Sequence, residues 1–299
     1  MLTCEAGHRY ETRDGIPRLV VGAWGSDLAA VVGETATRFG EQWTQFADSA
    51  SVSRRDLVLH LPTGWRSSVF HGQVLDVGCG MGRYAALVAA EGAAVVGVDV
   101  SDAVDAGAVR YPNVAFVQAD LAALPFAPRA FDLVYSFGVL HHLPDPLVGL
   151  KSAFEMVRPG GWLLLWVYSK HGGLLRRGRI AGRNLVRRLP TLRRPLAALA
   201  AAFFWLFYVI PFRVTGRSPR THSFFSDKGY RQLFVDCYDA LSAPLEAYLE
   251  AEDCRRWIDL LGQDEAGYER RSDGSGWLIY VRRTPDDGRA HPDRAVAAS

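Results

Sequence analysis

The chain has 299 residues, 49% of them hydrophobic, and a formal net charge of +2. This length suits one large α/β domain with an insertion or two modest domains, and the first twenty residues lack the apolar stretch of a secretory leader. Four scattered cysteines (Cys4, Cys79, Cys237 and Cys254) indicate a reducing, cytoplasmic setting rather than a disulfide framework.

The first half of the chain predicts an alternating series of strands and helices. Residues 1–32 are expected to be irregular, and a helix is expected over 33–47, where Phe39, Trp43 and Phe46 recur at helical spacing. Strands are then predicted over 74–77, 94–98, 114–118, 131–136 and 162–168, with helices over 82–91, near Ser101 and over 146–157. Such alternation indicates right-handed crossovers and a parallel sheet.

The pattern stops for about 80 residues and resumes near the C-terminus. A helix is predicted over 251–261, and two strands over 268–271 and 277–283 flank an Asp273-Gly274 turn, which is typical of a hairpin. The predicted fold is therefore α/β, with a seven-stranded sheet that ends in an antiparallel hairpin. Residues 284–299 are predicted to be a disordered tail.

A glycine-rich turn follows the first strand of this series, at Gly78-Cys79-Gly80-Met81-Gly82. Alternate glycines let the backbone bend sharply and approach a ligand closely. The next helix presents its first N–H groups to the same place. By itself, such a turn also fits an ordinary tight strand-to-helix connection.

The ends of three further strands carry groups that suit a nucleotide. Asp99 lies 19 residues after Gly80 and can accept hydrogen bonds from both hydroxyls of a ribose. Asp120 can accept from an adenine amino group, and the main chain of Leu121 faces the ring. His141 and His142 follow the fourth strand. Because these ends share one edge of a parallel sheet, we expect them to meet at one ligand site.

Segments 75–82, 96–99, 118–125 and 131–143 resemble the successive motifs of class I S-adenosylmethionine-dependent methyltransferases, which have a Rossmann-like sheet, and 159–167 resembles their turn into the fifth strand. The resemblance covers roughly residues 70–170 and implies S-adenosylmethionine as cofactor. It implies that Asp76 and the loop contact the methionyl part, that Asp99 holds the ribose, and that Phe137 and His142 line the methyl-transfer pocket. The expected cofactor residues are Asp76, Gly78, Cys79, Gly80, Arg83, Asp99, Val100, Asp120, Leu121 and Phe137.

Two other functions remain open at this point. An NAD-dependent oxidoreductase would fit the loose G-x-G-x-x-A pattern over 80–85. However, Asp76 would repel a pyrophosphate beside the loop, whereas a methionyl ammonium would tolerate it. A non-catalytic S-adenosylmethionine-binding subunit is the second alternative, which the intact glycine loop and acids disfavour.

Methylation of a hydroxyl requires removal of its proton, for which histidine is the usual residue. The candidate bases are His142, His141 and His222, although adjacent histidines at this position recur in the family without an agreed role. The expected acceptor is the hydroxyl or amine of a small biosynthetic molecule that is anionic or hydrophobic. No metal site is expected.

The insertion over 170–250 is predicted to be a helical cap that is first basic and then apolar. Between Met156 and Ser226 there is no Asp or Glu but 13 of the 34 Lys and Arg residues, and 196–212 is an uncharged, mostly apolar run. A single membrane crossing is excluded because the last strands must rejoin the sheet. A cap, a subunit interface and a peripheral membrane contact through 176–212 all remain open. Nucleic acid is not expected, since aromatic residues do not interleave with the arginines.

The predicted organisation has four parts. Residues 1–32 resemble a vestigial zinc ribbon, with Cys4 and His8 left from a full ligand set. Residues 33–169 and 251–283 form the cofactor-binding domain, in which 38–46 either closes over the cofactor or packs as an ordinary helix. Residues 170–250 are the insertion and 284–299 the tail. The whole is similar to methyltransferases found with polysaccharide or secondary-metabolite genes.

Overall fold

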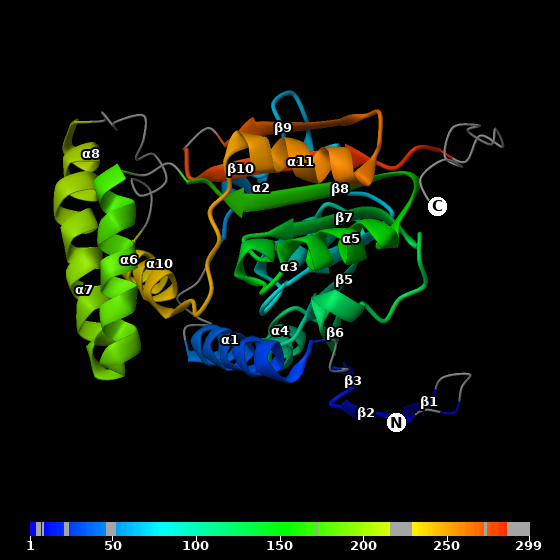
Figure 1. Cartoon of the computed structure of the whole chain (residues 1–299), viewed down its shortest axis with the longest axis horizontal. Coiled ribbons are helices and arrows are strands. Elements are labelled where there is room, and N and C mark those ends of the chain that lie inside the picture. Colours follow the sequence, from blue (N-terminus) through cyan, green and yellow to red (C-terminus); the bar gives the residue numbers. More distant parts are fainter. Residues whose placement is uncertain are drawn as a thin grey trace.

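A computed structural model describes residues 1–3, 7, 9–20, 24–45, 52–170, 173–215, 229–271 and 274–285. It contains one ten-stranded sheet in the order β1-β2-β3-β6-β5-β4-β7-β8-β10-β9 (Figure 1). The strands are β1 (Leu2–Thr3), β2 (Arg9–Arg13), β3 (Ile16–Leu19), β4 (Gln73–Val77), β5 (Ala94–Asp99), β6 (Ala115–Ala119), β7 (Phe131–Phe137), β8 (Val157–Tyr168), β9 (Ala266–Arg270) and β10 (Gly276–Arg282).

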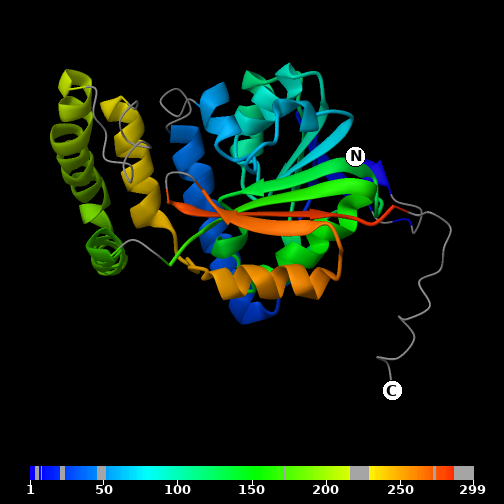
Figure 2. The ribbon, with the colours of Figure 1, turned by 90° about the horizontal axis from the view of Figure 1, so that it is seen from above.

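The centre of the sheet is parallel and covered by helices on both faces. Strand β4 pairs in parallel with β5 and β7, and its Val74, Leu75 and Val77 are fully buried, as expected of a strand with two covered faces. Helices α2 (Arg54–Val58), α3 (Arg83–Ala90) and α4 (Ala103–Arg110) contribute to the core on one face. Helices α5 (Pro146–Met156) and α11 (Ala251–Leu261) contribute to the core on the other (Figure 2).

The α/β class and the terminal hairpin are confirmed, because β10 pairs antiparallel with both β8 and β9. The expected count of seven strands is wrong, since the sheet has ten. The extra strands come from the N-terminal segment that was expected to be irregular. Asp14 and Gly15 take positive φ angles of 52° and 81° in a tight turn between β2 and β3. Strand β3 then pairs in parallel with β6, whose edge was otherwise open.

The β3 strand is fixed by charged and polar side chains more than by apolar burial. Arg18 donates to the side-chain oxygen of Gln118 at 2.9 Å and forms an ion pair with Asp105. The hydrophobic pattern over 16–19 is too short to predict a strand without these partners. Cys4 and His8, the residues of the zinc-ribbon resemblance, lie outside the described residues.

The insertion forms a small helical unit beside the carboxyl edge of the sheet. It consists of α6 (Gly173–Arg188), a continuous helix over Pro190–Thr215 that includes α7 (Arg193–Phe204), a π turn (Trp205–Val209) and α8 (Ile210–Thr215), and then α10 (Tyr230–Ser242). Val186, Ala201, Leu233 and Leu241 belong to its own apolar core. In both views α10 lies between α7 and the rest of the molecule (Figures 1 and 2).

Helix α1 (Ser26–Gln45) begins earlier than the expected residue 33 and crosses the carboxyl edge of the sheet. It contacts α4 and α10, and an added Cβ at Gly40 would come within 3.3 Å of Ser101 Cβ. The helix thus joins the sheet domain to the insertion.

Candidate active site

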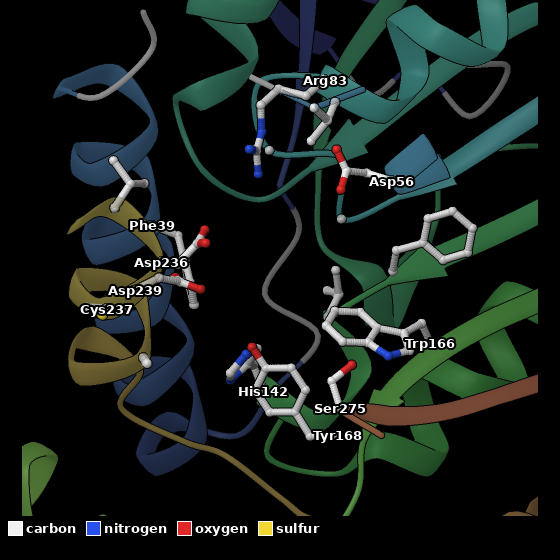
Figure 3. A pocket seen from close by; sticks show the side chains of 18 of the residues that line it. Phe39, Asp56, Arg83, His142, Trp166, Tyr168, Asp236, Cys237, Asp239 and Ser275 are labelled. Carbon is white, nitrogen blue, oxygen red and sulfur yellow. The ribbon is translucent and has the colours of Figure 1, made fainter. Parts of the chain in front are cut away.

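A cavity of about 1430 Å³ lies at the carboxyl ends of β4, β5, β7 and β8. Its other wall is formed by α1, α10 and parts of α6 and α7. Figure 3 shows Phe39, Asp236 and Asp239 on the helical side, facing Trp166 and Tyr168 on the sheet side. This is the edge at which parallel sheets bind ligands, as the sequence predicts.

The glycine loop between β4 and α3 forms one part of this wall. Gly78, Gly80 and Gly82 all have positive φ angles, of 80°, 55° and 79°, a conformation that side chains disfavour. A Cβ at Gly78 would lie 2.5 Å from the Val139 side chain, so the loop has no room for one. The N–H groups of Gly78 and Cys79 both donate to the main-chain oxygen of Val98, which ties the loop to the end of β5.

Asp99 occupies the end of β5 next to the loop. One of its carboxylate oxygens accepts from the Gly80 N–H at 2.8 Å, and the other accepts from the N–H and hydroxyl of Ser101 at 2.9 and 2.6 Å. Burial raises the pKa of Asp99. The side chain lines the cavity, and the oxygen that accepts from the Gly80 N–H has a second lone pair for a ligand hydroxyl.

Asp76 is a second carboxylate in the same wall and is only 4% exposed. It accepts a hydrogen bond from the hydroxyl of Tyr135 at 2.9 Å. Burial, and to a smaller extent the charge of Asp99, raise its pKa to about 7, although the Tyr135 bond opposes this. A buried carboxylate of this kind is stabilised by any cation that binds beside it.

Nine of the ten expected cofactor residues line this one cavity. Asp120 does not. Its carboxylate accepts from the Ala122 N–H at 2.8 Å, so it caps the turn that begins at Leu121. Leu121 itself lines the cavity, so this strand contributes an apolar side chain where an acid was expected.

The three expected catalytic histidines have different positions. His142 lines the cavity, and its Nδ1 lies 2.7 Å from the main-chain oxygen of Leu245. Burial lowers its pKa. His141 is fully buried against Tyr168, with ring centroids 4.0 Å apart, and does not line the cavity. His222 lies outside the described residues.

A buried aromatic and basic cluster at the sheet side of the cavity was missed by the sequence analysis. His60 stacks on Phe137 at 4.4 Å, and its two ring nitrogens contact the Asp56 main-chain oxygen at 2.8 Å and Arg271 at 3.0 Å. Burial and the charge of Arg271 hold the pKa of His60 well below its usual value. The Arg271 guanidinium lies 4.9 Å from the Trp166 ring. No motif surrounds His60 or Arg271, so no local signal could have found them.

The insertion supplies a second group of missed residues. Asp236 and Asp239 on α10 point into the cavity (Figure 3). Arg179 on α6 lines it as well and stacks 5.2 Å from the ring of Tyr168. These residues lie in the segment where the alternating pattern stops, and only their helical spacing, Asp236 to Asp239, indicated a shared face.

The far end of the cavity is apolar. It is lined by α7 and by the facing side of α10, through Leu196, Leu199, Ala200, Phe203, Phe204, Val235 and Leu241. The cavity therefore has a polar part at the glycine loop, while the insertion supplies both an apolar end and the carboxylates of Asp236 and Asp239. His142 and Tyr168 also lie in its wall.

Comparisons with known proteins agree with this geometry. Residues 75–165 match the family model of a methyltransferase domain. The chain is 38% identical over 135 residues to trans-aconitate 2-methyltransferase of Deinococcus radiodurans, a match covering 44% of this chain and 49% of the relative. It is 35% identical over 101 residues to a ubiquinone biosynthesis O-methyltransferase of Paracidovorax citrulli, covering 30% and 41%. The chain thus spans about half or less of these relatives.

A solved structure supports the fold beyond the matched segment. A protein described under "Conversion of a Disulfide Bond into a Thioacetal Group during Echinomycin Biosynthesis" aligns with a TM-score of 0.50 at 17% identity. The alignment covers 85% of this chain and 94% of that chain. At this identity the likeness concerns the fold alone.

Proposed function

Because residues 75–165 form a class I S-adenosylmethionine-dependent methyltransferase domain, we propose that the chain is a cytoplasmic methyltransferase that acts on a hydroxyl or amine of a small biosynthetic molecule. The observation that carries the proposal is that Gly78, Asp99 and His142 line one cavity. Among the described residues, Cys79, Cys237 and Cys254 form no disulfide, which fits a reducing compartment.

The residues present fit S-adenosylmethionine. Asp99 would hold the ribose, Val100 and Leu121 would flank the adenine, and the loop would contact the methionyl part. Burial raises the pKa of Asp76 to about 7. The ammonium of the methionyl part would stabilise the ionised Asp76 carboxylate, whereas a pyrophosphate would destabilise it. When bound, S-adenosylmethionine supplies a methyl group that its sulfonium has already activated.

The chain's own residues then have three tasks. The cavity walls orient the acceptor and exclude water from it. His142 holds a neutral imidazole because burial lowers its pKa. Since Nδ1 donates to the Leu245 oxygen, Nε2 carries the lone pair that would accept the proton of an acceptor hydroxyl.

The cavity favours an acceptor with a sizeable apolar part. Its far wall of leucine, alanine and phenylalanine side chains suits a hydrophobic natural product or a lipid-linked intermediate better than a small polar sugar. Arg83 and Arg179 lie in the same lining and suit an anionic group such as a phosphate, whereas Asp236 and Asp239 suit a hydroxyl or an amine. The Paracidovorax relative is named as an O-methyltransferase, which favours oxygen as the methylated atom.

Two experiments test this proposal against its alternatives. Calorimetry should show binding of S-adenosylhomocysteine and none of NAD; the reverse result would indicate an oxidoreductase. A screen with methyl-labelled S-adenosylmethionine should then transfer label to a hydrophobic hydroxyl compound, free or phosphorylated. Binding of S-adenosylhomocysteine with no transfer to any member of a broad panel would favour a non-catalytic binding subunit.

A further inference from the structure

We propose that the outer face of the helix over Pro190–Thr215 binds the surface of an anionic lipid bilayer. The helix is long and apolar enough to cross a membrane by composition, with a mean hydropathy of 1.9, yet only 17% of its most apolar window is buried inside the molecule. Most of this apolar helix is therefore at least partly exposed to solvent, which is unusual for a surface helix of a soluble domain.

The exposed apolar side chains form one stripe along this helix. Leu199, Leu206, Phe207 and Val214 are 67%, 56%, 64% and 79% exposed, and Phe203 and Ile210 continue the same line at 44% and 39%. Apart from the adjacent pair Leu206 and Phe207, they follow one another at spacings of three and four residues, which place them on one side. The small residues Ala197 and Ala201 lie on the opposite side and are buried in the core of the insertion with α10. We call the six exposed residues the apolar stripe.

Charge on both sides of the apolar stripe matches an anionic surface. Arg187 and Arg188 at the end of α6 and Arg194 at the start of α7 are exposed, and Arg213 lies near the other end. No Asp or Glu occurs between Met156 and Ser226. An apolar face bordered by arginines is typical of helices that lie in the interface of membranes rich in anionic lipid.

The same charge disfavours a second copy of the chain as the occupant. A symmetric dimer through the apolar stripe would place two arginine-rich α6 helices close together. Aromatic side chains on the exposed side further favour lipid, since the rings of Phe203 and Phe207 in the apolar stripe lie 5.0 Å apart and are both exposed.

The fold requires the helix to lie on the bilayer rather than cross it. Strand β10 follows the helix in sequence but pairs with β8, which precedes it, from Gly276 opposite Tyr168 to Arg282 opposite Trp162. The chain on both sides of the helix therefore belongs to one sheet. Helix α10, which carries Asp236 and Asp239, packs on the buried side and could not enter the bilayer. In Figures 1 and 2, α7 and α8 lie on the side of the molecule that is farthest from the sheet.

The membrane-binding face borders the cavity. Leu199 and Phe203 belong to the apolar stripe and also line the cavity. A bilayer bound at this face would therefore lie next to the apolar end of the site. Binding itself depends only on the outer face, so it can be measured without cofactor or acceptor.

Sedimentation with vesicles tests the proposal on the full chain. We expect binding to phosphatidylcholine vesicles that contain phosphatidylglycerol, weaker binding to phosphatidylcholine alone, and a loss of binding as salt rises. The double variant Leu206→Ser with Phe207→Ser should reduce binding at least ~10-fold. Arg187→Gln with Arg188→Gln should reduce binding roughly 10-fold and weaken its dependence on salt.

Controls separate this result from misfolding and from the proposed reaction. Leu260→Ser changes an exposed leucine on α11 and should leave vesicle binding unchanged. Each variant should bind S-adenosylhomocysteine as the unchanged chain does, because none of the four substituted residues lines the cavity. Absence of binding to anionic vesicles at low salt would overturn the proposal. So would a dimer in sedimentation velocity that dissociates in the Leu206→Ser, Phe207→Ser variant while vesicle binding persists.

Discussion

His142 Nδ1 lies 2.7 Å from the main-chain oxygen of Leu245, a residue 103 positions later in the chain. A carbonyl oxygen can only accept, so Nδ1 donates and Nε2 keeps its lone pair. A second bond, from the Ala247 N–H to the His141 main-chain oxygen at 2.8 Å, fixes the same two segments. The connection after α10 thus sets the tautomer of a histidine that follows β7.

This arrangement predicts that His142→Gln lowers turnover by roughly 10²- to 10⁴-fold, the usual contribution of general base catalysis. Affinity for S-adenosylhomocysteine should stay within about two-fold, because the glycine loop and Asp99 are untouched. Single-turnover methylation and calorimetry measure the two quantities. His71→Gln, at an exposed histidine outside the cavity, is the matched control. Near-normal turnover of His142→Gln would remove His142 from the role of base.

The pH dependence of turnover should show the lowered pKa of His142. Burial disfavours the imidazolium, so the neutral base persists below the ordinary histidine pKa of about 6.5. We therefore expect kcat/KM for the acceptor, at saturating S-adenosylmethionine, to be level between about pH 6.5 and 8 and to fall only at lower pH. An initial-rate profile from pH 5 to 9 measures this. A midpoint above 7 on the acidic limb would assign the base to another group.

Asp99→Asn should weaken S-adenosylhomocysteine binding by roughly 10- to 100-fold, because the ribose hydroxyls would no longer donate to a charged carboxylate. The substitution also alters the contact with the Gly80 N–H, which helps to shape the loop. Asp102→Asn is the control, since that side chain is 71% exposed and pairs with Arg13. Unchanged affinity in Asp99→Asn would contradict the assignment of the whole cofactor site.

Asp76 should make the free protein less stable as pH rises. Burial raises its pKa to about 7 in the folded chain, whereas an aspartate in an unfolded chain has a pKa of about 3.9. Between these limits the folded state binds more protons than the unfolded state. The free energy of unfolding then falls with rising pH, by on the order of 1 kcal/mol per unit. Asp76→Asn should remove this slope in thermal unfolding at pH 5, 6, 7 and 8. Glu252→Gln, at a side chain 82% exposed, should not. An unaltered slope in Asp76→Asn would mean that Asp76 is ionised throughout.

The sequence predicted those parts of the site whose positions follow from a local sequence pattern, such as a glycine-rich turn or a residue at the end of a strand. The glycine loop, Asp99 and His142 follow parallel strands, and the carboxyl ends of such strands must share an edge. Asp120 shows the limit of this reasoning. Its position at the end of β6 was predicted, but its hydrogen bond to the Ala122 N–H turns the carboxylate into a local cap.

The rest of the site depends on contacts that no local pattern contains. His60 and Arg271 meet across 211 residues, and Arg18 finds Asp105 and Gln118 only after β3 joins the sheet. Charge pairs of this kind follow from the tertiary fold and do not specify it. The composition of the sequence was enough to recognise the insertion. It could not show which side of α7 faces the cavity, because both sides of α7 are apolar.

The ion pairs of Glu246 supply the last prediction, because they hold the segment that orients His142. The Glu246 side chain is 1% exposed, forms ion pairs with Arg183 and Arg179 and accepts from the Tyr248 hydroxyl at 2.6 Å. Glu246→Ala would leave two largely buried guanidinium groups without this partner, at a cost of about 3 kcal/mol. Because Leu245 is adjacent, turnover should fall as well.

Two further variants decide whether the network or general stability is responsible for the loss. Removing all three charges in Arg179→Met, Arg183→Met and Glu246→Met should recover much of the stability, since apolar replacement of a buried ionic triad is often neutral. Lys170→Met breaks the exposed pair with Glu250, where the side chains are 54% and 51% exposed, and should cost less than about 1 kcal/mol. Chemical unfolding and single-turnover methylation measure both effects. If Glu246→Ala lost stability but kept full turnover at a temperature where it stays folded, the segment at Leu245 would not position His142.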